Sequence, residues 1–357
     1  MDQPNQRRVG LRDVAQRLGV SAVTVSNAFN RPDQLSPGLR ERVLKAAAEM
    51  GYIGPAPSAR MLRTGHAGAI ALYNHDPITY LLEDPIAIAF MGGIAEICQE
   101  RQTGLLVLPG AATARSGPTA IDTAAVDSFI VYALAEDDPG LARILARRQP
   151  VVAVDVGPVA GATTIGIDDR AAAALAAEHL LQLGHRSLAV IAMDFNADGR
   201  IGLADRSRIE TASFRITRER WQGYADACAR FGIDPATIPV YETIGNAEHG
   251  AEAGARILLA QSSKRPTAIL AMSDRLALGA MRAAEQLGLN VPRDLSIVGF
   301  DDIPQAREVG TGLTTIRQPS REKGRLAAHV LLDGKMAGSE TILLPTELVR
   351  RGSTSAV

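Results

Sequence analysis

Acidic and hydroxyl side chains follow three short apolar runs of the chain, where they could hold a polar small molecule. They are Asp155 after residues 151–154, Ser273 and Asp274 after residues 269–272, and Asp301 and Asp302 after residues 297–300. Carboxylates in such places can accept hydrogen bonds from ligand hydroxyl groups. Asp274 has an alternative role, because it precedes a helical pattern whose N-terminus a carboxylate stabilises without any ligand.

These apolar runs alternate with amphipathic stretches of helical length. The predicted strands are residues 68–74, 105–109, 128–133, 151–154, 188–193, 268–272 and 295–300, and the predicted helices include 87–102, 169–183, 218–231 and 274–287. Continuous apolar strands separated by helices indicate parallel sheets covered on both faces. A body of roughly 290 residues exceeds one comfortable core, so two lobes are expected.

The first part of the chain, residues 11–51, has the pattern of three short helices. Apolar side chains recur on one stripe of residues 11–18, and Ser21 can cap a second helix over residues 22–29. A third helix begins at Ser36. The turn of about three residues between the first two helices is typical of the helix-turn-helix motif, although helical triplets with a solvated basic face also occur in protein-binding domains.

The charge of the chain is divided unevenly. Residues 1–65 hold ten Lys and Arg against five Asp and Glu, a net charge of +5, and the whole chain has −1, so the remainder has −6. A basic head on an acidic body is what a module that binds DNA phosphates, attached to a separate sensor, is expected to show.

A specific set of residues in this head matches a known pattern. They are Asp13-Val14-Ala15, Gly19-Val20-Ser21, Thr24-Val25-Ser26, Asn30, Ser36, Arg40, Val43 and Gly51-Tyr52, and the match continues through residues 59–65 and most of the chain. With them the chain resembles the lactose-repressor (LacI/GalR) family of bacterial transcription regulators. The resemblance implies an all-α, three-helix helix-turn-helix head and an α/β body of two doubly wound lobes, like those of periplasmic binding proteins.

The resemblance places the second helix in the major groove of DNA. It implies base-edge contacts for Ala22, Val23 and Asn27, phosphate contacts for Thr24, Ser26 and Asn30, and a further DNA contact for Ser36. Ala22 and Val23 cannot make bidentate hydrogen bonds, so they could read only shape and thymine methyl groups, which leaves Asn27 as the candidate adenine reader. Capping or solvation of the helix is the alternative role of Thr24 and Ser26.

Residues 54–65 form the predicted linker. The resemblance implies that they become a hinge helix only when two copies pack over the minor groove, where Leu62 wedges between base pairs and Arg60 contacts DNA. Pro57 makes this linker one residue longer than the commoner form and leaves two hinge registers open. A flexible tether is the alternative interpretation.

The resemblance also sets the expected domain boundaries. The head covers residues 1–53, the hinge 54–65 and the two-lobed effector-binding and dimerisation domain 66–357, with an N-lobe of 66–161 and 317–336 and a C-lobe of 162–316 and 337–350. Three segments, near residues 159–164, 314–319 and 336–341, are expected to cross between the lobes. The effector would lie in the cleft, outside the carboxyl ends of the strands.

Further effector contacts follow from the resemblance. Arg220 corresponds to the family's effector-binding arginine, and its five donors suit sugar hydroxyls or a carboxylate. Trp221 could stack on a sugar ring or lie in the core, and Tyr132 and residues 80–84 are expected on the N-lobe side of the cleft. Residues 194–216 form an insertion that is longer and more polar than is usual in the family. It could be a solvated loop or a lid over the effector.

Several classes of protein lack support in the sequence. Two cysteines, Cys98 and Cys228, are too few and too far apart for a disulfide framework or a metal site and suit a reducing cytoplasm. A signal peptide, an apolar run of membrane-spanning length, a phosphate-binding loop and a nucleophile elbow are all missing from the pattern. We therefore expect no cofactor, metal, catalytic residue or membrane contact. A solute-binding protein and a sugar or nucleotide enzyme of similar fold remain the alternatives.

The function that uses every feature is ligand-responsive regulation of transcription. We expect a cytoplasmic homodimer, a repressor, that binds a pseudo-palindromic double-stranded DNA operator and responds to a small molecule, a sugar or sugar derivative. Release from DNA and co-repression both remain open as the effect of the ligand. The final residues, 353–357, contain no leucine heptads, so a dimer is expected instead of a tail-mediated tetramer.

Overall fold

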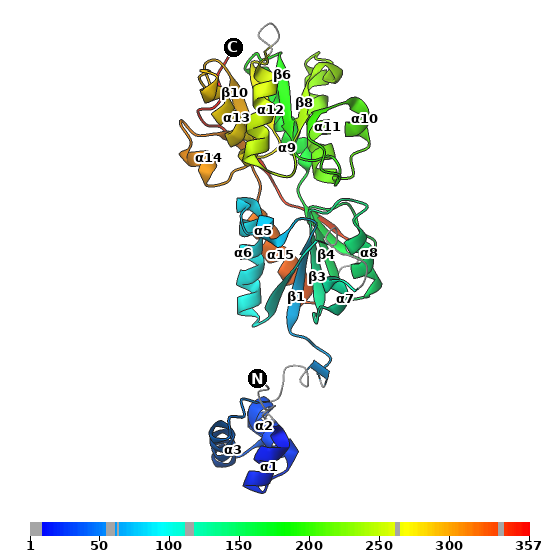
Figure 1. Ribbon diagram of the computed structural model, residues 1–357, viewed down its shortest axis with the longest axis vertical. Coiled ribbons are helices and arrows are strands. Elements are labelled where there is room, and N and C mark those ends of the chain that lie inside the picture. The colour runs from blue at the N-terminus through cyan, green and yellow to red at the C-terminus, as the bar shows by residue number, and fades with distance from the viewer. Residues whose placement is uncertain (1–8, 55–60, 63, 111–117, 261–264, 335–338) are drawn as a thin grey trace, which may run out of the picture. The chain divides into compact units, whose positions relative to one another are not determined.

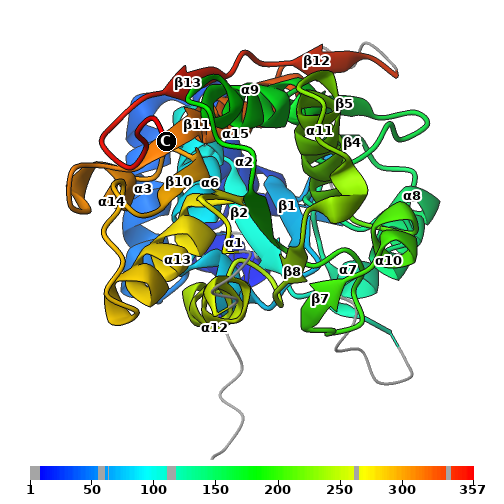
Figure 2. The same ribbon diagram turned by 90° about the horizontal axis from the view of Figure 1, so that it is seen from above.

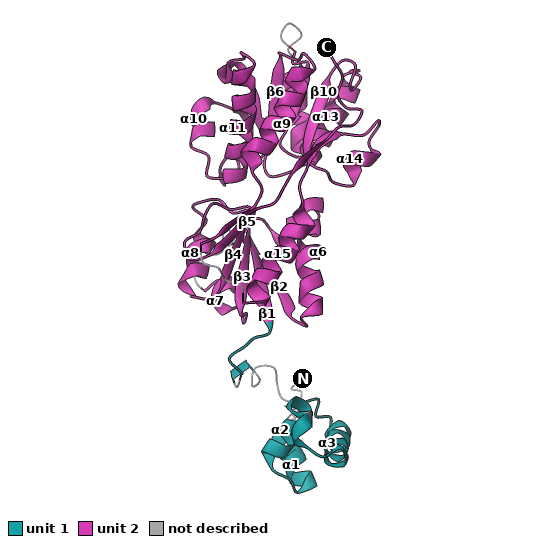
Figure 3. Cartoon of the chain, turned by 180° about the vertical axis from the view of Figure 1, so that it is seen from behind, with its two compact units in different colours: residues 1–68 teal, residues 69–357 magenta. Residues whose placement is uncertain are grey.

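The computed structural model describes residues 9–54, 61–62, 64–110, 118–260, 265–334 and 339–357. The chain divides into two compact units, residues 1–68 and residues 69–357, coloured teal and magenta in Figure 3. No helix among the described residues is long and apolar enough to cross a membrane.

The first unit contains the three predicted helices. They are α1 (Leu11–Leu18), α2 (Ala22–Asn30) and α3 (Pro37–Glu49), with a 3-10 turn η1 (Pro32–Gln34) between the last two. The Oγ of Ser21 accepts a hydrogen bond from the backbone N–H of Thr24 at 3.0 Å, which caps α2 as predicted. Val14, Val25 and Val43, one from each helix, are fully buried in the small core that holds the helices together.

The first sheet of the second unit, which defines the N-lobe, has six parallel strands in the order β12-β5-β4-β3-β1-β2. The strands are β1 (Ala69–Asn74), β2 (Gly104–Leu108), β3 (Ser128–Tyr132), β4 (Val151–Val154), β5 (Thr163–Gly166) and β12 (Thr341–Leu343). Helices α6 (Pro85–Glu100) and α15 (Ser320–Leu332) cover one face, α7 (Ala120–Thr123) and α8 (Pro139–Ala146) cover the other, and α5 (Ile78–Leu81) follows β1 (Figure 1). The buried apolar residues on both faces explain the continuous apolar strands of the sequence.

The second sheet defines the C-lobe and has seven strands in the order β13-β11-β10-β9-β6-β8-β7. The strands are β6 (Leu188–Ala192), β7 (Gly202–Ala204), β8 (Val240–Glu242), β9 (Ala268–Ala271), β10 (Ser296–Asp301), β11 (Thr314–Arg317) and β13 (Glu347–Val349). The two edge strands β7 and β13 are antiparallel to their neighbours, and the other pairings are parallel.

Helices cover both faces of the second sheet as well (Figure 2). Helices α9 (Asp169–Gln182) and α11 (Arg215–Arg230) lie on one face, and α12 (Glu248–Leu259) and α13 (Asp274–Gln286) lie on the other. Short helices α10 (Arg206–Glu210), α14 (Gln305–Glu308) and η3 (Pro235–Thr237) complete the lobe. The predicted three-helix head and two doubly wound lobes are confirmed.

Glycine allows the closest helix contact in the C-lobe. A Cβ placed on Gly223 of α11 would lie 2.1 Å from the backbone oxygen of Arg170 in α9. Any larger side chain would therefore push the two helices apart. This contact matters for the site described below, because α11 carries Arg220.

The chain crosses between the two lobes three times within the described residues, and two crossings differ from the prediction. Strand β5 pairs with β4, so the first crossing follows residue 166 instead of lying at 159–164. Strand β12 pairs with β5, so the third crossing lies between residues 343 and 347 instead of 336–341. The second crossing, between β11 and α15, falls within the predicted 314–319. Strands β5 and β12 were missed because they have only four and three residues, and both belong to the sheet of the N-lobe.

The insertion at residues 194–216 is an ordered part of the C-lobe. It contains the edge strand β7 and the helix α10, whose Arg208 is buried. The guanidinium of Arg208 pairs with the buried Glu242 at 2.7 Å and with Asp198 at 2.5 Å. The segment is therefore anchored to the sheet by ion pairs, which corrects the expectation of a merely solvated loop.

Candidate functional site

The exposed face of α2 begins with the two apolar residues that, by the family resemblance, are expected to face base edges. Ala22 and Val23 are both exposed, and Val23 has 66% of its surface accessible. Val25 and Ala28 of the same helix are buried against α1 and α3. Val25 and Ala28 form the side of α2 that packs in the core, so the apolar side chain of Val23 does not contribute to that core.

The polar residues of α2 hydrogen-bond with their own neighbours. The Nδ2 of Asn27 donates to Oε1 of Gln34 at 3.1 Å, and Nδ2 of Asn30 donates to the backbone oxygen of Ser26 at 3.0 Å. The hydroxyls of Thr24 and Ser21 lie 2.9 Å apart. None of these residues is fully buried, so each can exchange its present partner for a phosphate or a base.

Three more predicted DNA contacts lie outside α2. Ser36 is exposed just before α3, and its hydroxyl makes no capping hydrogen bond. Leu62 is helical together with Met61 and has 84% of its surface accessible. Arg60, together with most of the predicted hinge, lies outside the described residues.

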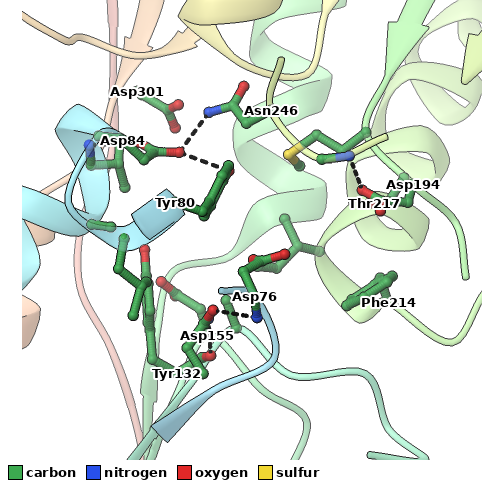
Figure 4. Close-up of a pocket in the computed structure, with 18 of the residues that line it drawn as sticks. Asp76, Tyr80, Asp84, Tyr132, Asp155, Asp194, Phe214, Thr217, Asn246 and Asp301 are labelled. Carbon is green, nitrogen blue, oxygen red and sulfur yellow. Dashed lines mark hydrogen bonds between the residues drawn. The ribbon is translucent and has the colours of Figure 1, made fainter. Parts of the chain in front are cut away.

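A cavity of about 120 Å³ lies between the two lobes of the second unit (Figure 4). Its walls are formed by residues that follow strands of both sheets. The polar lining residues are Asn74, Asp76, Tyr80, Asp84, Tyr132, Asp155, Asp194, Thr217, Arg220, Asn246, Asp301 and Gln318. The strand order reverses direction beside β1 in the first sheet and beside β6 in the second. Asp76 follows β1 and Asp194 follows β6. Such a reversal point is where doubly wound sheets usually bind their ligands.

Arg220 of α11 is the cation of this cavity, with 4% of its surface accessible. Its Nε donates to Oδ1 of Asp169 at 2.9 Å, and its Nη1 donates to the backbone oxygen of Met272. The guanidinium carbon lies 3.6 Å from the ring centroid of Phe300, and Nη1 is 3.9 Å from Oδ1 of Asp301. Burial raises the pKa of Asp301, and the Arg220 charge opposes that rise.

A second buried cation, Lys323 of α15, holds the N-lobe side. Its Nζ lies 2.6 and 2.8 Å from the two carboxylate oxygens of Asp155 and 2.7 Å from Oε1 of Gln318. The Nε2 of Gln318 donates to Oδ1 of Asp301 at 2.5 Å. Gln318 lies in the second crossing segment, so a continuous set of polar contacts joins Asp155 of the N-lobe to Asp301 of the C-lobe.

Another set of hydrogen bonds joins the lobes on the far side of the cavity. Asp84 caps α6 through the backbone N–H of Ile86 and accepts from Tyr80 at 2.8 Å and from Asn246 at 3.0 Å. The Oγ of Ser273 donates to the amide oxygen of Asn246. Asn246 belongs to the C-lobe, so the N-terminus of α6 is tied to the segment that follows β8.

Left-handed backbone occurs at three residues that line the cavity. The φ angles are 49° at Ala133, 55° at Asp155 and 122° at Asp301. Such conformations cost a non-glycine residue about 1–3 kcal/mol each and cluster at functional sites. In each case the residue lies at the carboxyl end of a strand, where the turn directs side chains toward the cavity.

The structure brings together four of the seven effector residues expected from the sequence, namely Arg220, Asp301, Asp155 and Tyr132. Asp274 does not line the cavity, because it is fully buried and accepts hydrogen bonds from the hydroxyl of Thr315 and the backbone N–H of Ile303. Burial raises its pKa to about 7. Asp274 was expected to contact the effector, but its carboxylate bonds to other residues of the C-lobe instead.

Ser273 and Trp221 are also placed away from the cavity. The Oγ of Ser273 caps α13 by accepting from the backbone N–H of Leu276 at 3.1 Å, and it reaches the cavity only through Asn246. Trp221 follows Arg220 by one residue, so it points to another face of α11 and packs against the C-lobe core beside α10. Trp221 does not line the cavity, so the expectation that it stacks on a sugar ring there is wrong and its alternative role in the core is the one that this fold supports.

The sequence interpretation missed several lining residues. They are Asn74, Asp76, Met193, Asp194, Phe214, Ile216, Thr217, Gly245, Asn246 and Gln318. Asn74 is the last residue of β1, and Asp194 and Asn246 follow β6 and β8, so the strand-end rule that selected Asp155 could have found them. Phe214 and Asp194 lie at the two ends of the insertion, whose place beside the cavity depends on the fold.

The comparisons with known proteins agree with this geometry. The family model "Bacterial regulatory proteins, lacI family" matches residues 10–54, and the model "Periplasmic binding protein-like domain" matches residues 177–354. The HTH-type transcriptional regulator Rv3575c of Mycobacterium tuberculosis is 43% identical over 349 residues, which cover 97% of this chain and 96% of the relative. The HTH-type transcriptional repressor CytR of Escherichia coli is 34% identical over 361 residues, covering 97% and 96%.

Solved structures extend the similarity to the whole fold. The lac repressor dimer bound to operator and an anti-inducer has a TM-score of 0.76 and 27% identity, with 98% of this chain and 100% of that chain covered. The complex of the transcriptional regulator CelR with cellobiose has a TM-score of 0.67 and 26% identity, with 97% and 100% covered.

A helix-turn-helix head followed by a two-lobed, ligand-binding type of body defines a class of DNA-binding transcriptional regulators. The chain belongs to the LacI family of that class, as its residues predicted.

Proposed function

We propose that two copies of this chain bind a pseudo-palindromic DNA operator in the bacterial cytoplasm and repress transcription, and that a small hydroxyl-rich molecule in the inter-lobe cavity changes operator affinity. The observation that carries this proposal is the cavity itself, because residues of both lobes face one space. A molecule that touches both lobes stabilises one angle between them more than others.

The head supplies the DNA-binding part of the proposal. Ala22, Val23 and Asn27 would face base edges in the major groove, and Thr24, Ser26, Asn30 and Ser36 would bind the phosphate backbone. One such helix covers only half of a symmetric site, so two copies are needed. Leu62, which is exposed, is proposed to insert into the minor groove, with Arg60 beside it.

The second unit supplies the sensor. Arg220, Asp301, Asp155 and Tyr132 are proposed to contact the effector, with Asn246 and Asp84 completing the wall. Coupling between an effector site and a DNA site usually changes affinity by about 5- to 150-fold. The cellobiose in the CelR complex supports a sugar-like effector, as do the hydrogen-bonding groups of the cavity.

The test is operator binding by purified full-length protein. Genomic fragments selected by the protein are expected to contain a symmetric motif, and affinity is expected to fall steeply with salt because bound cations release counterions from DNA. Sedimentation should give a dimer. A monomer that shows no preference among fragments at low salt would contradict the proposal.

The hinge is tested separately with Leu62→Ala. Loss of the wedge is expected to weaken operator binding without changing the melting temperature, since Leu62 contacts no core. Exposed Ile53, which has 98% of its surface accessible, offers a matched control as Ile53→Ala. Equal effects of the two substitutions would favour a plain tether over a hinge helix.

A further inference from the structure

The charges around the inter-lobe cavity are strongly unbalanced. Five carboxylates line it, and among the described lining residues Arg220 alone has a cationic side chain; the five are Asp76, Asp84, Asp155, Asp194 and Asp301. Asp155 is neutralised from behind by Lys323, and Asp301 lies beside Arg220. Asp84 is surrounded by three hydrogen-bond donors. The remaining pair, Asp76 and Asp194, carries the excess negative charge.

Asp76 and Asp194 come from opposite lobes to the same space (Figure 4). Asp76 follows β1 of the N-lobe, and Asp194 follows β6 of the C-lobe. Oδ1 of Asp194 accepts from the backbone N–H of Gly245 at 2.8 Å. Within the described part of the chain, neither carboxylate has a cation in ion-pair contact. The nearby imidazole of His75 is already paired with Asp138 at 3.0 Å.

Burial is the main influence on the protonation of this pair. Burial raises the pKa of Asp194 to about 6, and the negative charge of Asp76 adds to the rise. Burial likewise raises the pKa of Asp76. The contribution of Asp76 to the raised pKa of Asp194 shows that the two negative charges act on each other across the boundary between the lobes.

Two buried residues elsewhere in the cavity carry hydrogen-bond donors. Tyr132, which has 8% of its surface accessible, lines the cavity and carries a hydroxyl group. Arg220 also lines the cavity, and its Nε and Nη1 are engaged with Asp169 and Met272. Buried donors of this kind are satisfied by a ligand or by water. They call for oxygen acceptors on the bound molecule.

Building on the proposed function, we propose that the effector is a hydroxyl-rich molecule that carries a protonated amine and lacks phosphate and carboxylate groups. The ammonium lies between Asp76 and Asp194, and ligand oxygens accept hydrogen bonds from Tyr132 and Arg220. The ring of Phe214, at the end of the insertion, also lines the cavity and adds an aromatic face favourable to a cation.

The physical reason is the difference between the three charge types of ligand. An ammonium neutralises the two carboxylates as the lobes enclose it, and charge-assisted hydrogen bonds are about twice as strong as neutral ones. A neutral polyol leaves the like charges buried without compensation. A phosphate adds negative charge, since Arg220 is already balanced by Asp169 and Asp301.

The experiment uses probes that share a skeleton and differ in charge. Calorimetric titration of the full-length protein compares glucosamine, glucose and glucose 6-phosphate; galactosamine, galactose and galactose 6-phosphate; and tris(hydroxymethyl)aminomethane with pentaerythritol. The amine is expected to bind about tenfold or more tightly than its neutral counterpart, and the phosphates are expected not to bind. Asp76→Asn and Asp194→Asn should remove the advantage of the amine, whereas the exposed control Asp137→Asn should keep it.

Several results would overturn this inference. They are equal or tighter binding of a neutral or phosphorylated probe, an amine advantage that survives both substitutions, and failure of every amine probe to bind at millimolar concentration. The melting temperature of the empty variants provides a check on folding, and it should rise because a repulsive charge is removed. Operator binding measured in parallel separates the two proposals. An amine that binds without changing operator affinity leaves the ligand class intact and contradicts the proposed regulation.

Discussion

The recognition helix α2 and the inter-lobe cavity place their polar side chains in opposite environments. Asn27 and Asn30 of α2 lie at the surface and bond to near neighbours in the chain. Arg220 and Asp301 of the cavity are buried, and their partners lie 51 and 17 residues away in sequence. We infer that changes in α2 affect binding and leave folding intact, whereas changes in the cavity affect both.

The largest expected effect that tests this comparison is that of Arg220→Ala. Removing the guanidinium leaves Asp169 and Asp301 as buried charges without a cation, which is expected to lower the free energy of unfolding by about 3–5 kcal/mol. Urea unfolding measures the change. The matched control is Arg230→Ala on the same helix, whose ion pair with Glu178 is partly exposed and is expected to contribute less than about 1 kcal/mol. Similar losses for both variants would contradict the distinction.

A smaller effect, on binding alone, is expected for Asn27→Ala. Loss of one bidentate base contact should weaken operator binding by about 1–3 kcal/mol, measured by fluorescence anisotropy. The free energy of unfolding should change by no more than about 0.5 kcal/mol, because Asn27 is at the surface. Gln34→Ala is the control, since it removes only the partner of Asn27 within the protein. A large decrease in the free energy of unfolding of the Asn27 variant would show that Asn27 stabilises the fold.

The pH dependence of stability should come from the body. Burial raises the folded pKa of Asp194 to about 6 and that of Asp274 to about 7, from an ordinary value of 3.8. Between about pH 7 and 4 the folded chain therefore binds protons that the unfolded chain does not. Stability should rise as the pH falls through this window, by at most about 1.4 kcal/mol per pH unit for each proton.

Urea unfolding at pH 8, 7, 6 and 5 measures this slope. Asp274→Asn should flatten it, because the substitution removes one of the buried carboxyl groups whose pKa is raised. Below about pH 4 the carboxyl of Asp302, whose pKa the Arg351 and Arg317 guanidiniums hold low against its burial, should begin to oppose the trend. A free energy of unfolding that falls steadily from pH 8 to 5 would contradict the prediction, because it would mean that the pKa values of these carboxyl groups are not raised in the folded chain.

The smallest effect is expected for Ala133→Gly at the cavity wall. Ala133 has a φ of 49°, a conformation that glycine adopts without strain. Relief of about 1–2 kcal/mol of strain is partly offset by the greater freedom of glycine in the unfolded chain, so a gain below about 1 kcal/mol is expected. Thermal unfolding measures the gain. A loss of stability would mean that the methyl group packs better than its backbone conformation suggests.

Much of the fold could be predicted because its signals are local. The predicted strands at 151–154 and 188–193 and the helix at 169–183 agree with β4, β6 and α9 to within one residue. The short strands β5, β7, β8, β11, β12 and β13 were not predicted, because three or four residues carry too little periodicity. Strand β12 pairs with the distant β5, which no local pattern reveals, and overlooking these two strands placed two lobe crossings too early.

The candidate site divides in the same way. Asp155 and Asp301 were selected because they end apolar strands, and a carboxylate at such an end faces the crevice. The same rule selected Asp274, yet Thr315 and Ile303 of neighbouring segments take up both of its oxygens. Trp221 was selected for its chemistry, and the rotation of α11 turns it to another face.

The sequence by itself determined the helix-turn-helix head, the succession of strands and helices, and the family, since each depends on residues within a turn or two of one another. Tertiary structure alone decided which carboxylates face the cavity and which are left without a cation. Lys323 reaches Asp155, and Arg220 reaches Asp169 and Asp301, only after distant segments of the chain pack together. Burial then sets how strongly each pair of charges interacts.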